Sequence, residues 1–245
     1  TSRMIAQQGG VLMKWGIMAT GNIAAKFART IHEMHASEET LVAVGSRDAN
    51  RAKAFADAYG IPNFYGSYEE LVSDPEVEAV YIATPNHLHF ANTMLCLNAG
   101  KHVLCEKPFT TNAEDARLLY EEGEKRGLFV MEAFWIRFLP LFEQLLSLID
   151  SKKYGELRHA RCDYGFTIQE ARRERKFKSE LGGGALLDIG IYNLGFLYMV
   201  MGAVPESFTS QVHMNEYETD DFSALQLYFP GGRTAHSVQS IGILM

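Results

Sequence analysis

The sequence predicts a two-domain α/β protein, in which a parallel-sheet domain is followed by an α+β domain with an open, mainly antiparallel sheet. Two observations predict this fold class. From Lys14 to Phe134, short apolar runs alternate with segments of helical spacing, which is the pattern of βαβ units. Beyond Trp135, apolar and polar residues alternate with a period of two, as in half-buried antiparallel strands. We therefore expect domains at 13–134 and 135–245.

Composition restricts the classes of protein to consider. The chain has 245 residues, of which 47% are hydrophobic and 22% charged, as in ordinary globular proteins. A formal net charge of −7 argues against a nucleic-acid partner, because affinity for nucleic acids depends on clustered Lys and Arg. The cysteines are odd in number and have no CxxC spacing, so we expect neither a disulfide framework nor a zinc site. This usage suits the cytoplasm. The cysteines are Cys96, Cys105 and Cys162.

The two ends of the chain carry separate expectations. Residues 1–12 lack the apolar core of a signal peptide, and we expect them to be a leader of uncertain origin before a native start at Met13. No run approaches the roughly 20 apolar residues of a membrane helix, so no membrane partner is expected. The last residues, 241–245, are apolar with no polar tail, and the second domain is therefore expected to be incomplete at its C-terminus.

In the first domain, each strand-like run is followed by a helical pattern. Ile23, Phe27 and Ile31 recur at helical spacing after the first run, and the second helix is expected to stop at Gly60. Capping-box patterns at 67–70 and 111–114 predict two more helix starts, the second helix running to Gly127. Strands are expected at 15–18, 41–45, 77–84, 102–108 and 128–134.

In the second domain, helices flank the alternating segments. Apolar residues at helical spacing predict a helix over 138–149, and a long apolar run predicts another over 185–201, stopped by Gly202. Alternating segments predict strands at 160–166, 208–214 and 225–229, and a further strand beyond the turn at 230–232.

A phosphate-binding turn is expected after the first strand. Ala19, Thr20, Gly21, Asn22 and Ile23 occupy the place of a G-x-G-x-x-G fingerprint, although alanine replaces its first and third glycines. The missing side chain of the central glycine would let a pyrophosphate approach the backbone at the helix N-terminus. By itself such a turn also occurs in proteins that bind no nucleotide.

The end of the second strand favours NADP over NAD. Ser46 and Arg47 stand where an NAD-specific protein would place an acid for the ribose 2′-hydroxyl, and a guanidinium suits a 2′-phosphate instead. Two alternatives stay open. Asp48 keeps NAD use possible, and Arg47 can instead pair with Asp48 or Asp57 in solvent.

Polar residues also end the next two strands. Thr84, Pro85 and Asn86 follow the strand expected beside the first, where Asn86 can bind a ribose or cap the next helix. His87 and His89 lie there too, but no third ligand has suitable spacing, so no metal site is predicted. The run 102–108 delivers Glu106, Lys107 and Pro108 to the carboxyl end of its strand, where ligands of parallel sheets bind; a solvated charge pair is the alternative.

Together these motifs resemble the glucose-fructose oxidoreductase/inositol dehydrogenase (Gfo/Idh/MocA) family, most closely its branch of dimeric dihydrodiol dehydrogenases and NADP-dependent D-xylose dehydrogenases. The resemblance covers the chain from Lys14 onward. It implies a Rossmann domain, a second domain whose open sheet pairs subunits in a homodimer, and a cis Lys107-Pro108 bond. The motifs that carry it are 22–24, 46–47, 84–89, 106–108, 131–138 and 182–192.

The resemblance also assigns roles to residues. Asp188 and Tyr192 stand four apart on one helix and so share a face, although a tyrosine on an apolar helix is more commonly part of the core. Tyr192 is the expected acid-base catalyst, Lys107 lowers its pKa and orients the substrate oxygen, and Asp188 holds the substrate or Lys107. Asp188 can instead simply anchor the glycine turn before it.

Further contacts follow from the same resemblance. Glu106 would bind the nicotinamide ribose, and Trp135 with Phe134 would form a wall of the site. Lys107, Trp135, Arg137 and His89 are counted among the cofactor contacts. Arg137 can also contact the substrate, and a structural ion pair is an equal alternative for it.

The expected activity is therefore NADP-dependent oxidation of a secondary alcohol or hemiacetal in a sugar or cyclic trans-diol. Two alternatives stay open, because fold does not determine function. One is a non-catalytic dinucleotide-binding sensor or partner protein. The other is a glycosidase of the same family that uses bound NAD transiently.

Overall fold

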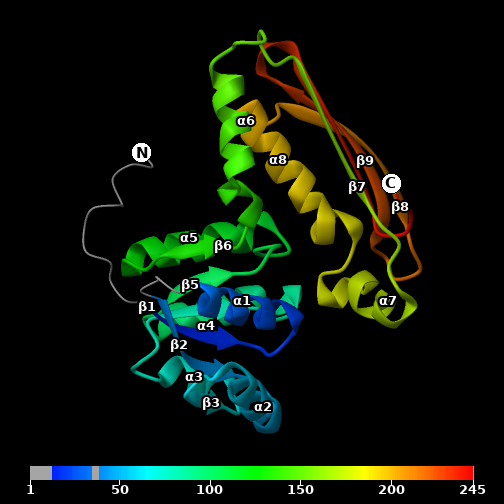
Figure 1. The fold of residues 1–245 in the computed structure, drawn as a ribbon. Helices are drawn as coiled ribbons and strands as arrows, with labels where there is room; N and C mark the ends of the chain where they lie inside the picture. Colours follow the sequence, from blue (N-terminus) through cyan, green and yellow to red (C-terminus); the bar gives the residue numbers. More distant parts are fainter. Residues whose placement is uncertain (1–12, 35–38, 245) are drawn as a thin grey trace. The chain divides into compact units, whose positions relative to one another are not determined.

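The computed structural model describes residues 13–34 and 39–244, apart from the side chains of 170–173. The leader expected at 1–12 lies outside the described residues. The chain divides into two compact units, one ending at Glu132 and the other beginning at Ala133 (Figure 1). Each unit is described by itself.

The first unit contains a six-stranded sheet in which all neighbouring strands are parallel, in the order β3-β2-β1-β4-β5-β6. This is the strand order of a Rossmann fold, whose ligands bind where the order reverses, between β1 and β4. The predicted parallel-sheet domain is thus confirmed, whereas β3 was not predicted. The strands are β1 (Met13–Met18), β2 (Glu39–Gly45), β3 (Asn63–Tyr65), β4 (Ala79–Ile82), β5 (His102–Cys105) and β6 (Val130–Glu132).

Helices cover both faces of this sheet, which explains why the central strands are continuously apolar. All of β4 is buried: Val80 and Ile82 pack with residues of α3, α4 and α5, while the Tyr81 ring stacks on Phe27 of α1 with centroids 4.0 Å apart. The helices are α1 (Asn22–Glu33), α2 (Ala49–Tyr59), α3 (Tyr68–Ser73), α4 (His89–Asn98) and α5 (Ala113–Arg126), with a 3-10 turn at Asn86–Leu88.

The two predicted capping boxes differ in outcome. Ser67 precedes α3, and its hydroxyl accepts a hydrogen bond from the Glu70 amide at 3.1 Å, as predicted. For α5 the expected start at Thr111 is wrong by one residue. Asn112 is the cap, because its extended backbone brings its side-chain oxygen within 2.8 Å of the Asp115 amide, and Asn caps at least as well as Thr.

The second unit contains a four-stranded sheet in the order β7-β10-β9-β8. β8, β9 and β10 pair in antiparallel fashion, and β7 adds to β10 in parallel. The predicted α+β domain with a mainly antiparallel sheet is confirmed, with this one parallel pair. The strands are β7 (His159–Gly165), β8 (Ser207–Met214), β9 (Asp220–Phe229) and β10 (Arg233–Ser240).

Helices α6 and α8 lie against one face of this second sheet (Figure 1). Their core includes Phe142 of α6, Leu197 of α8 and Phe229 of β9. The long helix predicted over 185–201 begins with a π-helical turn rather than regular α-helix. The helices are α6 (Pro140–Asp150), α7 (Glu170–Phe177) and α8 (Ile191–Met201), with the π-helical turn at Leu186–Gly190 and 3-10 turns at Trp135–Phe138, Ser179–Leu181 and Pro230–Gly232.

One stretch, Ser179–Met201, is long and apolar enough to cross a membrane by length and composition alone. This differs from the expectation that no run would approach that length. Half of its most apolar window is buried within the protein (50%), and Leu197, Val200 and Met201 belong to the core beneath the sheet. The core helix of a folded domain meets the same criterion, so the finding is weak support for a membrane span.

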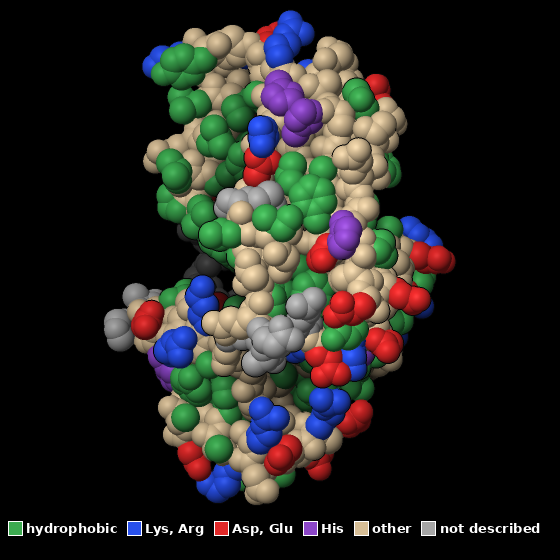
Figure 2. Space-filling model, turned by 90° about the vertical axis from the view of Figure 1, so that its right-hand side faces the viewer, with side chains coloured by type: hydrophobic (Ala, Val, Ile, Leu, Met, Phe, Trp, Pro, Cys, Tyr) green, Lys and Arg blue, Asp and Glu red, His purple; other side chains and the backbone are tan. Residues whose placement is uncertain are grey.

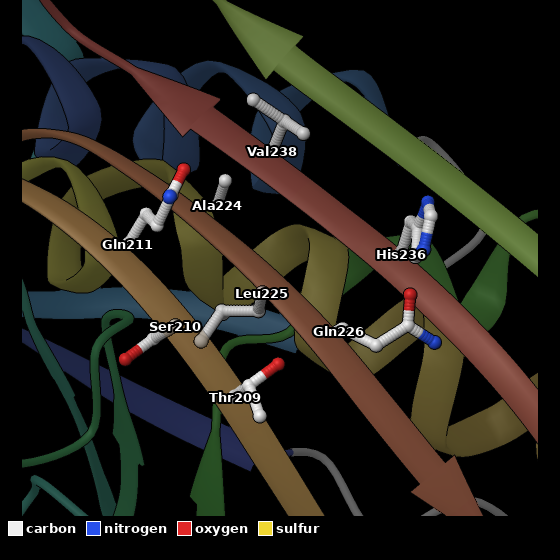
Figure 3. A pocket seen from close by; sticks show the side chains of 8 residues that line it. All are labelled: Thr209, Ser210, Gln211, Ala224, Leu225, Gln226, His236 and Val238. Atoms are coloured by element: carbon white, nitrogen blue, oxygen red, sulfur yellow. The ribbon is translucent and has the colours of Figure 1, made fainter.

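The other face of the second sheet is open. A shallow cavity of about 400 Å³ lies on it, and uncharged side chains cover much of this side of the molecule (Figures 2 and 3). None of the residues predicted to bind cofactor or substrate lines this cavity. Its lining residues are Thr209, Ser210, Gln211, Ala224, Leu225, Gln226, His236 and Val238.

Candidate active site

The turn between β1 and α1 has the features of a phosphate-binding turn. Gly21 precedes α1, and a Cβ added there would meet no protein atom within 4 Å. The first turn of α1 contains no acidic residue, and no side chain caps it. Ala19 adopts φ +95°, a left-handed conformation that favours glycine, while its amide donates to the Gly45 carbonyl at 2.9 Å. Thr20, Asn22 and Ile23 complete this turn, which fits the diphosphate of a dinucleotide.

The residues at the end of β2 that could discriminate between the ribose of NADP and that of NAD make different contacts. Ser46 is buried and accepts from the Asp48 amide at 3.3 Å. Asp48 caps α2, accepting from the amides of the second and third residues after it at 2.9 and 3.2 Å. Arg47 is exposed; burial raises the pKa of Tyr68, and the nearby Arg47 guanidinium partly opposes the rise. Asp57, the other proposed partner of Arg47, pairs with Lys53 at 2.7 Å.

His89 connects the backbone after β4 with the backbone after β5. This side chain is fully buried, with Nδ1 2.7 Å from the Pro108 carbonyl oxygen and Nε2 2.9 Å from that of Thr84. Burial holds the pKa of His89 below its usual value. We therefore assign His89 to the scaffold of the site, in place of the cofactor contact expected from the sequence. Pro85 and Asn86 lead into the 3-10 turn, and Asn86 does not cap α4, since Leu88 directly precedes that helix.

At the end of β5, the residues after Cys105 form a tightly held loop. The Lys107-Pro108 bond is cis, as the resemblance implied. The carboxylate of Glu106, expected to bind a ribose, accepts a hydrogen bond from the Tyr81 hydroxyl and another from the Lys107 amide at 3.2 Å. These contacts fix Glu106 beside Lys107 at the carboxyl edge of the sheet.

Tyr192, at the start of α8, lies among aromatic side chains of the second unit. Its hydroxyl oxygen accepts a hydrogen bond from Trp135 Nε1 at 3.1 Å. The rings of Phe134 and Tyr164 have centroids 5.8 and 6.3 Å from that of Tyr192. Gly195 permits this packing, because a Cβ there would lie 2.3 Å from the Phe134 ring. Trp135 is 55% exposed, so the cluster presents aromatic surface.

Asp188 is buried on the π-helical turn and forms an ion pair with Lys176 of α7. The glycine run before it serves close packing within the fold. A Cβ at Gly183 would lie 2.6 Å from the Lys176 carbonyl oxygen, and Gly184 has φ +109° beside Asp220. This supports the anchoring role that the sequence left open for Asp188. The sequence did not predict its partner Lys176, which lies in a basic run that resembles a solvated surface.

Arg137 lies exposed on the 3-10 turn Trp135–Phe138. Among the residues that the structure describes, no three His, Cys, Asp or Glu side chains gather closely enough to hold a metal ion.

Comparison with known proteins identifies the family. The family described as "Oxidoreductase family, NAD-binding Rossmann fold" matches residues 13–134, and the "GFO/IDH/MocA C-terminal domain" matches residues 142–242. The chain belongs to the Gfo/Idh/MocA family of oxidoreductases. Within this family, the trans-1,2-dihydrobenzene-1,2-diol dehydrogenase of Mus musculus is 42% identical over 221 residues, which cover 90% of this chain and 66% of the relative. The Homo sapiens enzyme of the same name is 43% identical over 220 residues, covering 89% and 65%.

Two solved structures are similar to this chain over most of its length. A 3-ketoreductase from Actinomadura kijaniata, in complex with NADP and TDP-benzene, has a TM-score of 0.86 and 28% identity over 94% of this chain and 70% of its own. An aldose-aldose oxidoreductase from Caulobacter crescentus, complexed with glycerol, has a TM-score of 0.86 and 28% identity over 94% and 71%. The chain thus spans about two thirds of the length of the proteins it matches.

Proposed function

We propose that the full-length protein is a dehydrogenase that uses NADP to oxidise a secondary alcohol of a cyclic trans-diol or a hemiacetal of a sugar. The dihydrodiol and aldose enzymes among its relatives support this substrate range. The observation that carries the proposal is the hydrogen bond from Trp135 to the phenolic oxygen of Tyr192. A donor aimed at that oxygen favours the phenolate, which is the form a general base requires.

The residues of the chain would handle the proton of the reaction. Oxidation of a carbinol breaks its C–H bond, with both electrons leaving as hydride, and its O–H bond, with the proton leaving separately. When bound, NADP would supply the nicotinamide to which the hydride goes. Tyr192 would accept the hydroxyl proton, and the Lys107 ammonium would favour the phenolate and orient the substrate oxygen. In the reverse direction, Tyr192 would return the proton to the carbonyl oxygen.

The cofactor preference rests on the first unit. An uncapped helix N-terminus behind Gly21 suits the diphosphate of either dinucleotide. Asp48 is engaged in capping α2, while Arg47 is exposed. A guanidinium offers the 2′-phosphate of NADP a charged, bidentate partner, whereas an NAD site uses an acid for the 2′-hydroxyl.

The substrate class rests on the aromatic cluster of the second unit. Phe134, Trp135 and Tyr164 surround Tyr192 with flat apolar rings. Such rings favour a ligand that has a flat apolar face and a polar edge. A cyclic diol or a pyranose has both.

Assembly and location complete the proposal. The open face of the second sheet carries Gln211, Gln226 and His236 around a shallow cavity, and we assign this face to pairing of subunits in a homodimer, as the family resemblance implied. Cys96 and Cys105 are free and buried. Unpaired thiols fit a reducing compartment, so we place the protein in the cytoplasm.

The catalytic roles are tested by Tyr192→Phe and Lys107→Met in the full-length protein. NADPH formation would be followed with trans-diols and aldoses, and NADP affinity by fluorescence titration. Each substitution should lower kcat by about 10²-fold or more, because each removes a group that acts on the transferred proton. NADP affinity should stay within about threefold, since Tyr192 handles only the substrate and Lys107 is one contact among several.

Wild-type turnover in both variants would refute the acid-base assignment. If the wild-type protein binds NADP but oxidises no diol or aldose, the proposed dehydrogenase activity itself is refuted. A sensor protein would give that second result.

A further inference from the structure

The loop that carries Lys107 is held by three titratable side chains, each acting on a different residue. Glu106 accepts from the Lys107 amide at 3.2 Å. His89 lies with Nδ1 2.7 Å from the Pro108 carbonyl oxygen. Glu132, the last residue of β6, accepts from the Phe109 amide at 2.9 Å. Three successive backbone positions are therefore restrained by side chains from β6, α4 and the loop itself.

The restraints on Pro108 and Phe109 are strong because they lie in protected surroundings. His89 is fully buried, Pro108 and Phe109 are buried, and Glu132 is partly buried. Burial raises the pKa of Glu132, and the Phe109 amide and the nearby charge of Lys107 partly oppose the rise. A buried amide that loses its acceptor has no water to replace it, so the backbone at Phe109 would have to move.

The sheet register places Glu132 beside this loop. Cys105, the last residue of β5, pairs with Glu132 across the parallel ladder. The Glu132 side chain therefore lies one strand away from the point where the chain leaves the sheet toward Lys107. Its carboxylate spans that gap to the amide two residues beyond Lys107.

We propose that Glu132 and His89 are positioning residues that fix the place of the Lys107 ammonium through the backbone of Pro108 and Phe109. This inference rests on the proposed function, in which Lys107 acts on the substrate oxygen. A displacement of about 1 Å in a catalytic group is enough to slow a reaction by about 10²-fold. A purely structural role would instead affect the stability of the fold and leave the turnover of folded protein unchanged.

Glu132 can be tested with matched substitutions in the full-length protein. Glu132→Met removes the acceptor at similar length, Glu132→Gln keeps an acceptor oxygen without the charge, and Glu132→Asp keeps the charge on a shorter arm. Glu124→Met removes an exposed carboxylate of α5 as the control. The measurements are kcat, KM, NADP affinity, the melting transition and hydrogen exchange at the Phe109 amide.

We expect Glu132→Met to lower kcat by about tenfold or more, with NADP affinity within about threefold and a cooperative melting transition. Exchange at the Phe109 amide should become faster. Glu132→Gln should restore slow exchange and most of kcat, and Glu124→Met should match the wild type. If Glu132→Met does not fold, Glu132→Asp should show the same loss of kcat in a smaller degree.

Two results would overturn the inference: unchanged exchange at Phe109 in the folded variants, or faster exchange with unchanged kcat. A wild-type protein without turnover would refute the proposed function separately. In that case the NMR signal of ¹³C-methylated Lys107 tests the inference. A chemical shift that changes in Glu132→Met and returns to the wild-type value in Glu132→Gln supports positioning of Lys107 by Glu132. A signal at the wild-type place in both variants refutes it.

Discussion

At the scale of single residues, His89 makes the stability of the fold depend on pH, through its contacts with the backbone after β4 and after β5. A neutral imidazole donates one N–H, so it can satisfy only one of the two carbonyl oxygens beside it, and burial keeps its pKa below the ordinary value of 6.5. The unfolded chain therefore takes up the proton more readily than the folded chain. The contribution of His89 to stability is present above about pH 6.5 and is lost as pH falls below it.

The free energy of unfolding should accordingly fall on acidification below about pH 6.5, by at most about 1.4 kcal/mol per pH unit from this residue. His89→Gln should remove that part of the slope, and His87→Gln, which changes the exposed neighbour, should retain it. Urea unfolding at a series of pH values measures both. Equal slopes in wild type and His89→Gln would show that His89 does not titrate in this range.

Residues whose roles depend on tertiary neighbours were the least predictable from sequence. Lys107 was singled out because it was expected to end an apolar strand, and the structure places it in the loop just after β5, which ends at Cys105. Glu132 also ends a strand, yet its pattern does not reveal that its carboxylate reaches the Phe109 amide. The same holds for Lys176 and Asp188, which come together only through the fold of the glycine run between them.

At the scale of secondary-structure elements, the start of α5 offers a direct comparison of sequence pattern and structure. Asn112→Ala removes the oxygen that accepts from the Asp115 amide and should destabilise the protein by about 1 kcal/mol. Thr111→Ala, at the residue that the capping-box pattern indicated, should change stability by less than about 0.5 kcal/mol. Urea unfolding midpoints measure both, and the reverse order of effects would restore Thr111 as the cap.

Elements with a clear apolar or helical pattern were predictable from sequence, whereas β3 and the π-helical turn were not. The buried strand β4 reads as an unbroken apolar run because helices cover both of its faces. β3 has only three residues, none of them buried, so it leaves no alternation to detect. The π-helical turn before α8 has the same apolar composition as the α-helix that follows, and periodicity alone does not separate them.

At the scale of the whole molecule, binding of the correct dinucleotide should stabilise the folded protein. A ligand at about 100 times its Kd adds about 2.7 kcal/mol, so NADP should raise Tm more than NAD at equal concentration. Arg47→Asp should abolish this difference or reverse it, because an acid repels the 2′-phosphate and suits the 2′-hydroxyl. Arg51→Asp makes the same charge change at an exposed position of α2 and should preserve the larger increase of Tm with NADP than with NAD. Equal losses for both cofactors in Arg47→Asp would exclude a role for Arg47 in selecting between them.

The parallel pairing of β7 with β10 also determines when the second sheet can be completed during synthesis. His159 of β7 and its neighbour Thr234 of β10 are separated by 75 positions. At roughly 5–20 residues per second, the ribosome adds that interval in roughly 4–15 s. Throughout that time β7 has made none of its backbone bonds to β10, whereas every strand of the first sheet has already been synthesised. Folding of the nascent chain should therefore proceed from the first unit to the second, and β7 is the strand most open to chaperones or to mispairing while it waits.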